Sequence, residues 1–208
     1  MDAFSAVLKD IEDTEPWLLD HMERVGMFAY ALGKEFDVDK GDCGRLYDAG
    51  FLHGLGEHYL HIYQHKANAS DETVAVVQKA WPMVAGAMIS MVPGFEYIAK
   101  LVAQCGENFD GSGDPFGAVK HDIHVYAMMV HIADLYDTVR MSGASHDSAA
   151  TELRRLSGIA IPKKMITPFL KNIVSNEDLR FDYADVRRQI GVYGQVQNDE
   201  PVESEASE

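Results

Sequence analysis

A helical repeat of apolar residues dominates this sequence and limits the folds that it can adopt. Between positions 18 and 36 the apolar residues follow steps of three and four: Leu18, Met22, Val25, Ala29, Leu32 and Phe36. This spacing places them on one face of an α-helix, which must be buried against other elements. We find no segment with the apolar–polar alternation that is typical of a half-buried strand. The sequence therefore predicts an all-α fold, in which a bundle of helices shares one core.

The same pattern predicts further helices along the chain. One should begin at Ser70, a good N-cap residue, and Pro82 should kink or restart it. The others are expected over Gly94–Cys105, from His121 to about Met141, and over Ser145–Leu156 and Pro162–Val174. The pattern is lost from position 191, and an acidic segment follows that cannot bury enough apolar surface to order itself. We expect one helical domain over residues 1–190 and a disordered acidic tail over 191–208.

The charge and cysteine content exclude some classes of function. The chain has 208 residues, of which 33 are acidic and 18 are Lys or Arg, so its formal net charge is −15. Such a surface repels phosphate backbones, and we expect no DNA or RNA binding. The sequence contains neither an apolar run of membrane-spanning length nor an N-terminal signal, so we expect a cytoplasmic protein without membrane insertion. In a reducing compartment Cys43 and Cys105 should be free thiols.

Three ionisable residues occupy positions where the helical pattern expects core. His21 shares a face with Val25, His53 follows Leu46 and Ala49 at helical spacing, and Asp134 continues the inward stripe of the helix that begins near position 121. A buried carboxylate is costly unless it meets a histidine, an arginine or a metal. Two histidines and one aspartate from separate helices can converge in a bundle core, as they do in bundle metal sites. A hydrogen-bonded cluster without metal satisfies the same pattern, and both interpretations stay open here.

A loop rich in glycine and proline follows the helix expected over 94–105. Its sequence is Gly106-Glu107-Asn108-Phe109-Asp110-Gly111-Ser112-Gly113-Asp114-Pro115. Glycine at alternate positions allows backbone conformations that other residues avoid, so a sharp loop can form at the helix end. We call residues 106–115 the signature loop, because they resemble a known motif of the form His-His-Glu-x-x-Asp-Gly-x-Gly-Tyr-Pro.

That motif belongs to the HD-GYP family of the HD superfamily, and other blocks of the chain resemble the family in the same order. They are His21-Met22-Glu23-Arg24-Val25, Phe51-Leu52-His53-Gly54-Leu55-Gly56-Glu57, Trp81-Pro82-Met83-Val84-Ala85-Gly86, the signature loop, Val130-His131-Ile132-Ala133-Asp134-Leu135-Tyr136-Asp137 and Gly158-Ile159-Ala160-Ile161-Pro162. The resemblance implies an HD-type helical bundle. It also implies a relationship to enzymes in which two or three bound metal ions activate a water that attacks cyclic di-GMP.

Compared with the family pattern, this chain keeps only part of the metal site. The retained ligand positions are His21, His53 and Asp134, while the vacated positions are Gly54, Trp81, Cys105 and Gly106. The signature loop keeps Glu107, Asp110, Gly111, Gly113 and Pro115, with Asp114 where the family has Tyr. Glu57 replaces a Lys that would contact phosphate. Glycine supplies no ligand atom and the indole N–H of tryptophan only donates, so we expect no dinuclear metal centre.

Several roles for neighbouring residues follow as expectations. Trp81 should be buried, filling the space that missing ligands and metals leave. Cys105 is interpreted as a small buried side chain, although Glu57, His58 or Cys105 could complete a site for one weakly bound metal. The histidines at positions 58, 61 and 65 have helical spacing, and we expect them on a solvated surface rather than around a metal.

The leading functional hypothesis is a catalytically degenerate HD-GYP-like domain that acts as a binding or regulatory module in bacterial cyclic di-GMP signalling. On this hypothesis no cofactor is expected. Diguanylate cyclase (GGDEF) domains are one class of protein partner that the resemblance suggests. Two alternatives remain. One is a metal-dependent phosphodiesterase with an altered or mononuclear site, and the other is a sensor that binds a cyclic dinucleotide without cutting it.

Overall fold

The chain forms an all-α bundle, as the apolar pattern predicts. The computed structural model describes residues 2–67, 79–176, 179, 181 and 183. Its α-helices are α1 Ser5–Thr14, α2 Pro16–Glu35, α3 Lys40–Leu52, α4 Leu55–Ala67, α6 Trp81–Ser90, α7 Glu96–Val102, α8 Val125–Met141, α9 His146–Arg155 and α10 Lys163–Ser175. Short 3-10 turns cover Asp2–Phe4 and Lys120–Asp122. Among the described residues the only β-type pairing is an isolated bridge between Ser157 and Ile161.

Helix boundaries follow local capping residues, and some differ from the sequence-based expectation. Pro82 lies in the first turn of α6, where a missing backbone N–H costs nothing, so it stands at the start of a helix. Helix α8 begins four residues after His121, because His124 caps it by accepting a hydrogen bond from the Tyr126 N–H. Ser145 caps α9 in the same way. The expected helix start at Ser70 and the acidic tail 191–208 lie outside the described residues.

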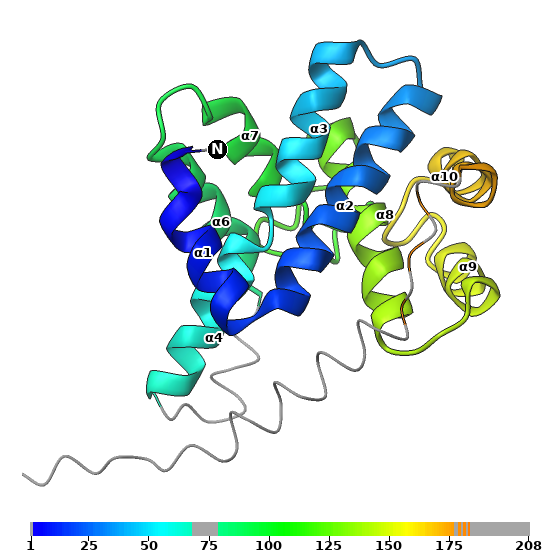
Figure 1. Cartoon of the computed structure of the whole chain (residues 1–208). Coiled ribbons are helices and arrows are strands. Elements are labelled where there is room, and N and C mark those ends of the chain that lie inside the picture. Colours follow the sequence, from blue (N-terminus) through cyan, green and yellow to red (C-terminus); the bar gives the residue numbers. More distant parts are fainter. Residues whose placement is uncertain (1, 68–78, 177–178, 180, 182, 184–208) are drawn as a thin grey trace, which may run out of the picture.

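Helix α2 lies at the centre of the bundle (Figure 1). It packs against α3 and α8, while α1, α4, α6 and α7 lie on one side of it and α9 and α10 on the other. On the second side the Phe28 ring of α2 meets Tyr136 of α8 and Phe169 of α10 edge to face, and Asn172 donates to the Ala31 carbonyl at 3.0 Å. Because α2 touches both halves of the bundle, its buried side chains can reach residues that are far apart in sequence.

Two glycines allow α2 and α3 to approach each other closely. A Cβ atom added at Gly50 of α3 would lie 2.8 Å from Gly26 Cα and 2.9 Å from Gly26 N, both backbone atoms of α2. Gly44, on the same helix, has open space around it. The close crossing brings the ends of α2 and α3 together with α8, where the retained ligand positions lie. None of the described helices is both long and apolar enough to cross a membrane.

Gly50 and Gly44, both in α3, should respond oppositely to substitution. Gly50→Ala forces a methyl group against the backbone of α2, and we expect a loss of about 1–3 kcal/mol in the free energy of unfolding, as for other overpacked cores. Gly44→Ala adds a methyl group in open space. Alanine also loses less backbone entropy than glycine when a helix forms, so this variant should raise the free energy of unfolding by about 0.5–1 kcal/mol. Urea unfolding followed by circular dichroism measures both. Equal effects of the two variants would contradict the close crossing.

Candidate functional site

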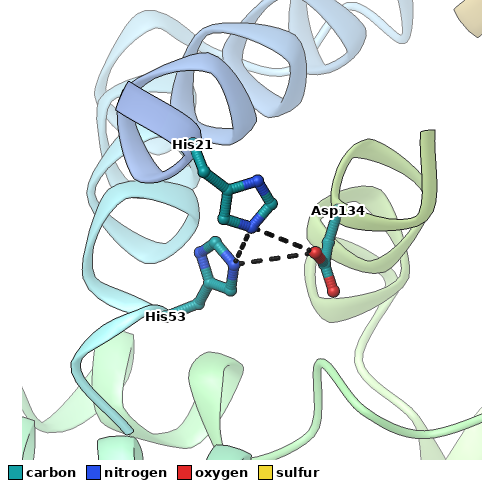
Figure 2. A group of neighbouring side chains, drawn as sticks. All are labelled: His21, His53 and Asp134. Carbon is teal, nitrogen blue, oxygen red and sulfur yellow. Dashed lines mark hydrogen bonds and ion pairs between the residues drawn. The ribbon is translucent and has the colours of Figure 1, made fainter. Parts of the chain in front are cut away.

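The structure brings together the three ligand positions that the chain retains (Figure 2). His21 comes from α2, His53 from the C-terminal cap of α3, and Asp134 from α8. His21 Nε2 lies 3.2 Å from His53 Nε2 and 3.3 Å from Asp134 Oδ1, and His53 Nε2 lies 3.8 Å from the same oxygen. Both histidines are buried, and the Asp134 side chain is 18% exposed. The site is therefore a nearly enclosed triad at the meeting point of three helices.

Hydrogen bonds on the far sides of the two rings fix the chemistry of the triad. His21 Nδ1 donates to Asp137 Oδ2 at 2.8 Å, and His53 Nδ1 donates to the Gly50 carbonyl. The Nε2 atom of each neutral ring is then an acceptor, and both lone pairs face Asp134 Oδ1. Three acceptors cannot satisfy one another, so they need a shared proton or a cation. Two imidazoles and one carboxylate, oriented by partners of this kind, are a donor set that fits one zinc or iron ion.

The electrostatics of the triad favour a positive charge in its centre. Burial opposes a charged imidazolium, but the hydrogen bonds of His21 with Asp134 and Asp137 outweigh burial and raise the pKa of His21 to about 10. Burial likewise opposes ionisation of Asp134, yet the two histidines hold the pKa of Asp134 well below its usual range. A proton on His21 therefore occupies the site in the metal-free chain, and a metal must displace it.

A second buried carboxylate, Asp137, holds the triad in place. Asp137 is fully buried and accepts from Arg24 Nε at 2.8 Å, from Arg24 Nη2 at 2.9 Å, and from the hydroxyl of Tyr183. Sequence reasoning did not assign a role to Asp137, Arg24 or Tyr183. The residue spacing could have pointed to Asp137 and Arg24. The patterns His21-x-x-Arg24 and Asp134-x-x-Asp137 each place two polar groups on one helical face.

Removing the charge of Asp137 should destabilise the whole bundle. Asp137→Asn keeps the shape of the side chain but removes the carboxylate that is hydrogen-bonded to the buried Arg24 guanidinium, and we expect a loss of about 3–5 kcal/mol in the free energy of unfolding. Asp122→Asn makes the same change at an exposed position and should stay within about 0.5 kcal/mol. Chemical denaturation near neutral pH compares them. Similar stabilities would show that Asp137 is not the electrostatic anchor of the site.

The vacated glycine positions are closed by packing. A Cβ atom at Gly54 would lie 2.5 Å from Met22 Cγ and 2.8 Å from Met22 Sδ, and Met22 is completely buried. A Cβ atom at Gly106 would lie 2.7 Å from Pro82 Cγ and 2.8 Å from the Asp114 carbonyl oxygen. A carboxylate at position 54 or an imidazole at position 106 would therefore require neighbouring atoms to move. Core side chains fill the room that further ligands would use.

Trp81 and Cys105 occupy the other two vacated positions. The Trp81 ring meets the His53 ring edge to face, with 5.5 Å between centroids. Trp81 is only half-buried, so the expectation that it is enclosed in the core is wrong; it forms a wall of an open cavity instead. Cys105 is completely buried, as expected, and its thiol donates to the Val102 carbonyl at 3.0 Å. Burial raises the pKa of Cys105 well above its ordinary value, which keeps it a neutral thiol.

A cavity of about 320 Å³ opens beside the triad. Its lining comprises His53, Glu57, Leu60, His61, Trp81, Asp134, Leu135 and Thr138. Glu57 and Asp134 thus both face this cavity. Among the residues that the structure describes, the metal-type cluster is limited to His21, His53 and Asp134, so Glu57, His58 and Cys105 do not complete it.

The signature loop is held by its own side chains. Glu107 is fully buried and accepts hydrogen bonds from the Phe116 N–H at 2.6 Å and the Ala118 N–H at 2.8 Å. Asp110 accepts from the Ser112 N–H and hydroxyl. Gly111 has a positive φ of 92°, and a Cβ atom at Gly113 would lie 2.0 Å from Asn108 N. Asp114 pairs with Lys79 at 3.5 Å, and a cis peptide joins Asp114 to Pro115. The carboxylates of the loop therefore shape its backbone.

A second polar cluster lies where α4 meets the α1–α2 junction. His58 Nδ1 donates to Glu15 Oε2 and His61 Nδ1 donates to Glu15 Oε1 at 2.6 Å, while His58 Nε2 lies 3.0 Å from Asp10 Oδ2. His58 and Glu15 are buried. The expectation that His58 and His61 lie on a solvated surface is therefore wrong for His58, because helix α1 covers it. The side chain of His65 lies outside the described part of the chain.

The Glu15 cluster should make stability depend on pH. Burial alone would raise the pKa of Glu15, but hydrogen bonds from His58 and His61 lower it to about 2, from an ordinary 4.5. Burial opposes the charge on His58 and His61, but Glu15 outweighs burial and raises the pKa of both above 6.5. The Glu15 contribution is lost as pH falls below about 4.5, and the histidine contribution is lost as pH rises above about 6.5. The cluster therefore stabilises most between these two values.

Glu15→Gln tests this window. Near pH 5.5 we expect it to lower the free energy of unfolding by about 1.5–3 kcal/mol, the range for hydrogen bonds to charged groups. The loss should shrink toward pH 9, where the histidines are neutral. Glu12→Gln, at an exposed position of α1, is the matched control and should have a small effect at every pH. A Glu15→Gln effect that does not vary with pH would contradict the ion pairing.

A comparison with known protein families identifies the family of this chain. The model of the family described as HD domain matches residues 6–158, most of the chain. The chain belongs to the HD domain family. The sequence-based identification with the HD superfamily is confirmed, and the matched residues include the whole triad. The search of curated proteins found no match.

Two solved structures share the fold of this HD domain. One is Bd1817, an HDG"Y"P protein from Bdellovibrio bacteriovorus, with a TM-score of 0.62 and 20% identity over 76% of this chain and 53% of that one. The other is a cyclic GMP-AMP-specific phosphodiesterase of V. cholerae, V-cGAP3, with a TM-score of 0.62 and 15% identity over 96% of this chain and 52% of that one. The chain thus spans about half the length of both proteins, and at these identities the likeness concerns the fold.

Proposed function

We propose that this HD domain does not hydrolyse cyclic dinucleotides and works as a binding or regulatory module in cytoplasmic signalling based on them. The proposal rests on one observation: core packing fills the places of the missing ligands. Met22 closes position 54 and Pro82 closes position 106. Hydrolysis by two metals needs several ligands that act together on two ions, and the part of the chain that the structure describes offers one set of three donors.

The cavity beside the triad also lacks the charge that a phosphodiester needs. Glu57 and Asp134 both line it, where a metal-bound phosphate would require cations. His61 also lines this cavity, but its Nδ1 is tied to Glu15 at 2.6 Å. The fold similarity to a cyclic GMP-AMP-specific phosphodiesterase supports the cyclic-dinucleotide context, while the acidic cavity supports a loss of turnover. If a nucleotide binds in this cavity without being cut, the domain is a sensor.

The signature loop supports a protein partner. Beyond the loop, Phe116 is 59% exposed and Val119 is 42% exposed, and a partner that covered them would gain free energy from burying apolar surface. The two carboxylate oxygens of Glu107 accept hydrogen bonds from the backbone N–H groups of Phe116 and Ala118, so the backbone of this surface is held in place. A signalling protein such as a diguanylate cyclase domain is the partner that we propose for it.

A specific observation favours a second candidate, a mononuclear metal-dependent phosphohydrolase. Asp137 and the Gly50 carbonyl hold the Nδ1 atoms of His21 and His53, so both Nε2 atoms are oriented for metal ligation once a metal displaces the proton on His21. Three protein ligands would leave coordination positions for water or substrate, and a metal there would supply an activated water. In this candidate His21, His53 and Asp134 would hold the ion, and Thr138 and Trp81 would bound the substrate.

Metal content and turnover separate the two candidates. We expect purified protein to bind at most one equivalent of iron, manganese or zinc, and to leave cyclic di-GMP and cyclic GMP-AMP intact under reducing, anaerobic conditions. Elemental analysis and chromatography of the nucleotides measure both. One equivalent of metal with turnover on the order of 1 s⁻¹ would establish the mononuclear enzyme. Two equivalents of metal would contradict both candidates.

Restoring one ligand provides the control. Gly54→Asp places a carboxylate against Met22, so it should destabilise the fold without adding a second metal. Gly54→Asp combined with Met22→Ala makes room for the carboxylate, yet positions 81, 105 and 106 still lack histidine. We therefore expect no hydrolysis from either variant. Turnover in the double variant alone would mean that packing by Met22 is the principal block.

A further inference from the structure

A pocket of about 780 Å³ lies away from the triad, at the N-terminal ends of α8 and α10. Its walls come from the signature loop and the segment after it, the first turns of both helices and the turn at Gly158. Its lining comprises Phe109, Lys120, His121, Ile123, His124, Val125, Met128, Gly158, Pro162, Lys163, Lys164 and Met165. None of these residues lines the cavity beside the triad. Along α8, Met128 and Asp134 are six residues apart, which is about 9 Å.

The charge of this pocket is opposite to that of the chain. Three lysines and two histidines line it, and the lining contains no Asp or Glu, although the net charge of the protein is −15. Within the described ranges, no ion pair is formed by the three pocket lysines, which are Lys120, Lys163 and Lys164. Other lysines do meet a carboxylate, namely Lys9, Lys79 and Lys171. These lysines lie in one pocket whose lining contains no carboxylate. They therefore create a local positive potential that attracts anions, although the protein as a whole is acidic.

The floor of the pocket is apolar and its walls are fixed. Ile123, Met128 and Met165 are buried, and Val125 is 41% exposed toward the opening. Burial lowers the pKa of His124, so this imidazole stays neutral and adds a flat face. Backbone hydrogen bonds from Phe109 N to the Ala160 carbonyl at 3.0 Å and from Asp110 N to the Ile159 carbonyl at 2.9 Å tie opposite walls together. A ligand therefore meets a preformed shape, which reduces the entropy cost of binding.

We propose that this pocket binds an organic phosphate, a small molecule with a phosphate group and a flat apolar body. Lysine ammonium groups bind phosphate as point charges, and Lys163 and Lys164 stand at the start of α10, whose N-terminus adds partial positive charge. The apolar floor takes the body of the ligand. A bare phosphate ion would leave most of the 780 Å³ without contacts, and an uncharged ring would leave the three lysines without a counter-charge. Both parts of the ligand are therefore needed.

Adenosine monophosphate tests the proposal, with adenosine and inorganic phosphate as its two halves. Isothermal titration calorimetry of the intact chain should show one saturable site for the nucleotide, with at least about tenfold weaker binding of either half, as a charge-assisted contact implies. Adenosine binding as tightly as the monophosphate would overturn the role of the lysines. The absence of saturable binding by the monophosphate would overturn the proposal.

Substitutions in and outside the pocket test whether the nucleotide binds there. Lys163→Gln combined with Lys164→Gln should raise the Kd for the monophosphate by about tenfold or more. Lys171→Gln, on the same helix but outside the pocket, should leave the Kd within about twofold. Val125→Asp puts a carboxylate at the opening and should also abolish binding; an acid in the first turn of α8 favours the helix, so the fold is kept.

Glu57→Gln separates this proposal from the proposed function. It removes a negative charge from the cavity beside the triad and should leave the monophosphate Kd unchanged. Tighter binding by Glu57→Gln, together with no effect of the lysine variants, would place the nucleotide in the other cavity and overturn the proposal. Loss of binding in the lysine variants alone supports it, whatever the metal content of the triad.

Discussion

The buried carboxylate of Asp137 is the constraint on which the centre of this bundle depends. It receives two hydrogen bonds from Arg24, one from His21 and one from Tyr183, so it joins α8 to α2 and to the chain beyond α10. A buried ion pair is stable when its lone pairs are satisfied, and here the carboxylate accepts four hydrogen bonds. The geometry of the His21 ring, and with it the triad, follows from this network.

The region around the triad combines a polar donor site with densely packed apolar side chains. On one side, His21, His53 and Asp134 keep three converging acceptors that need a cation. On the other side, Met22 and Pro82 pack where additional ligands would stand. Dense packing stabilises a core, whereas a multinuclear site needs an open, polar volume. The fold of an HD domain is therefore compatible with the loss of a full metal site, because apolar contacts replace the ligands.

Charge is distributed unevenly over the molecule. Asp10 and Glu15 pair with histidines of α4, and Glu57 and Asp134 face the cavity beside the triad. Carboxylates are absent from the lining of the pocket formed by Lys120, Lys163 and Lys164. A net charge describes the whole surface, but a ligand responds to the field of the pocket that it enters. This difference is why an acidic protein can still offer a site for an anion.

The helical class, most helix positions and the inward-facing residues follow from the amino-acid pattern. Periodicity identified the helix around positions 18–36, Pro82 marked a helix start, and inward spacing selected His21 and Asp134. The side chains that meet in the site are set by how the helices pack together. Periodicity gives the face that a residue occupies, but not the residue that packs opposite from another helix. The closure of position 54 by Met22, the half-burial of Trp81, the burial of His58 under α1 and the convergence on Asp137 all depend on the relative placement of helices distant in sequence, which long-range packing sets.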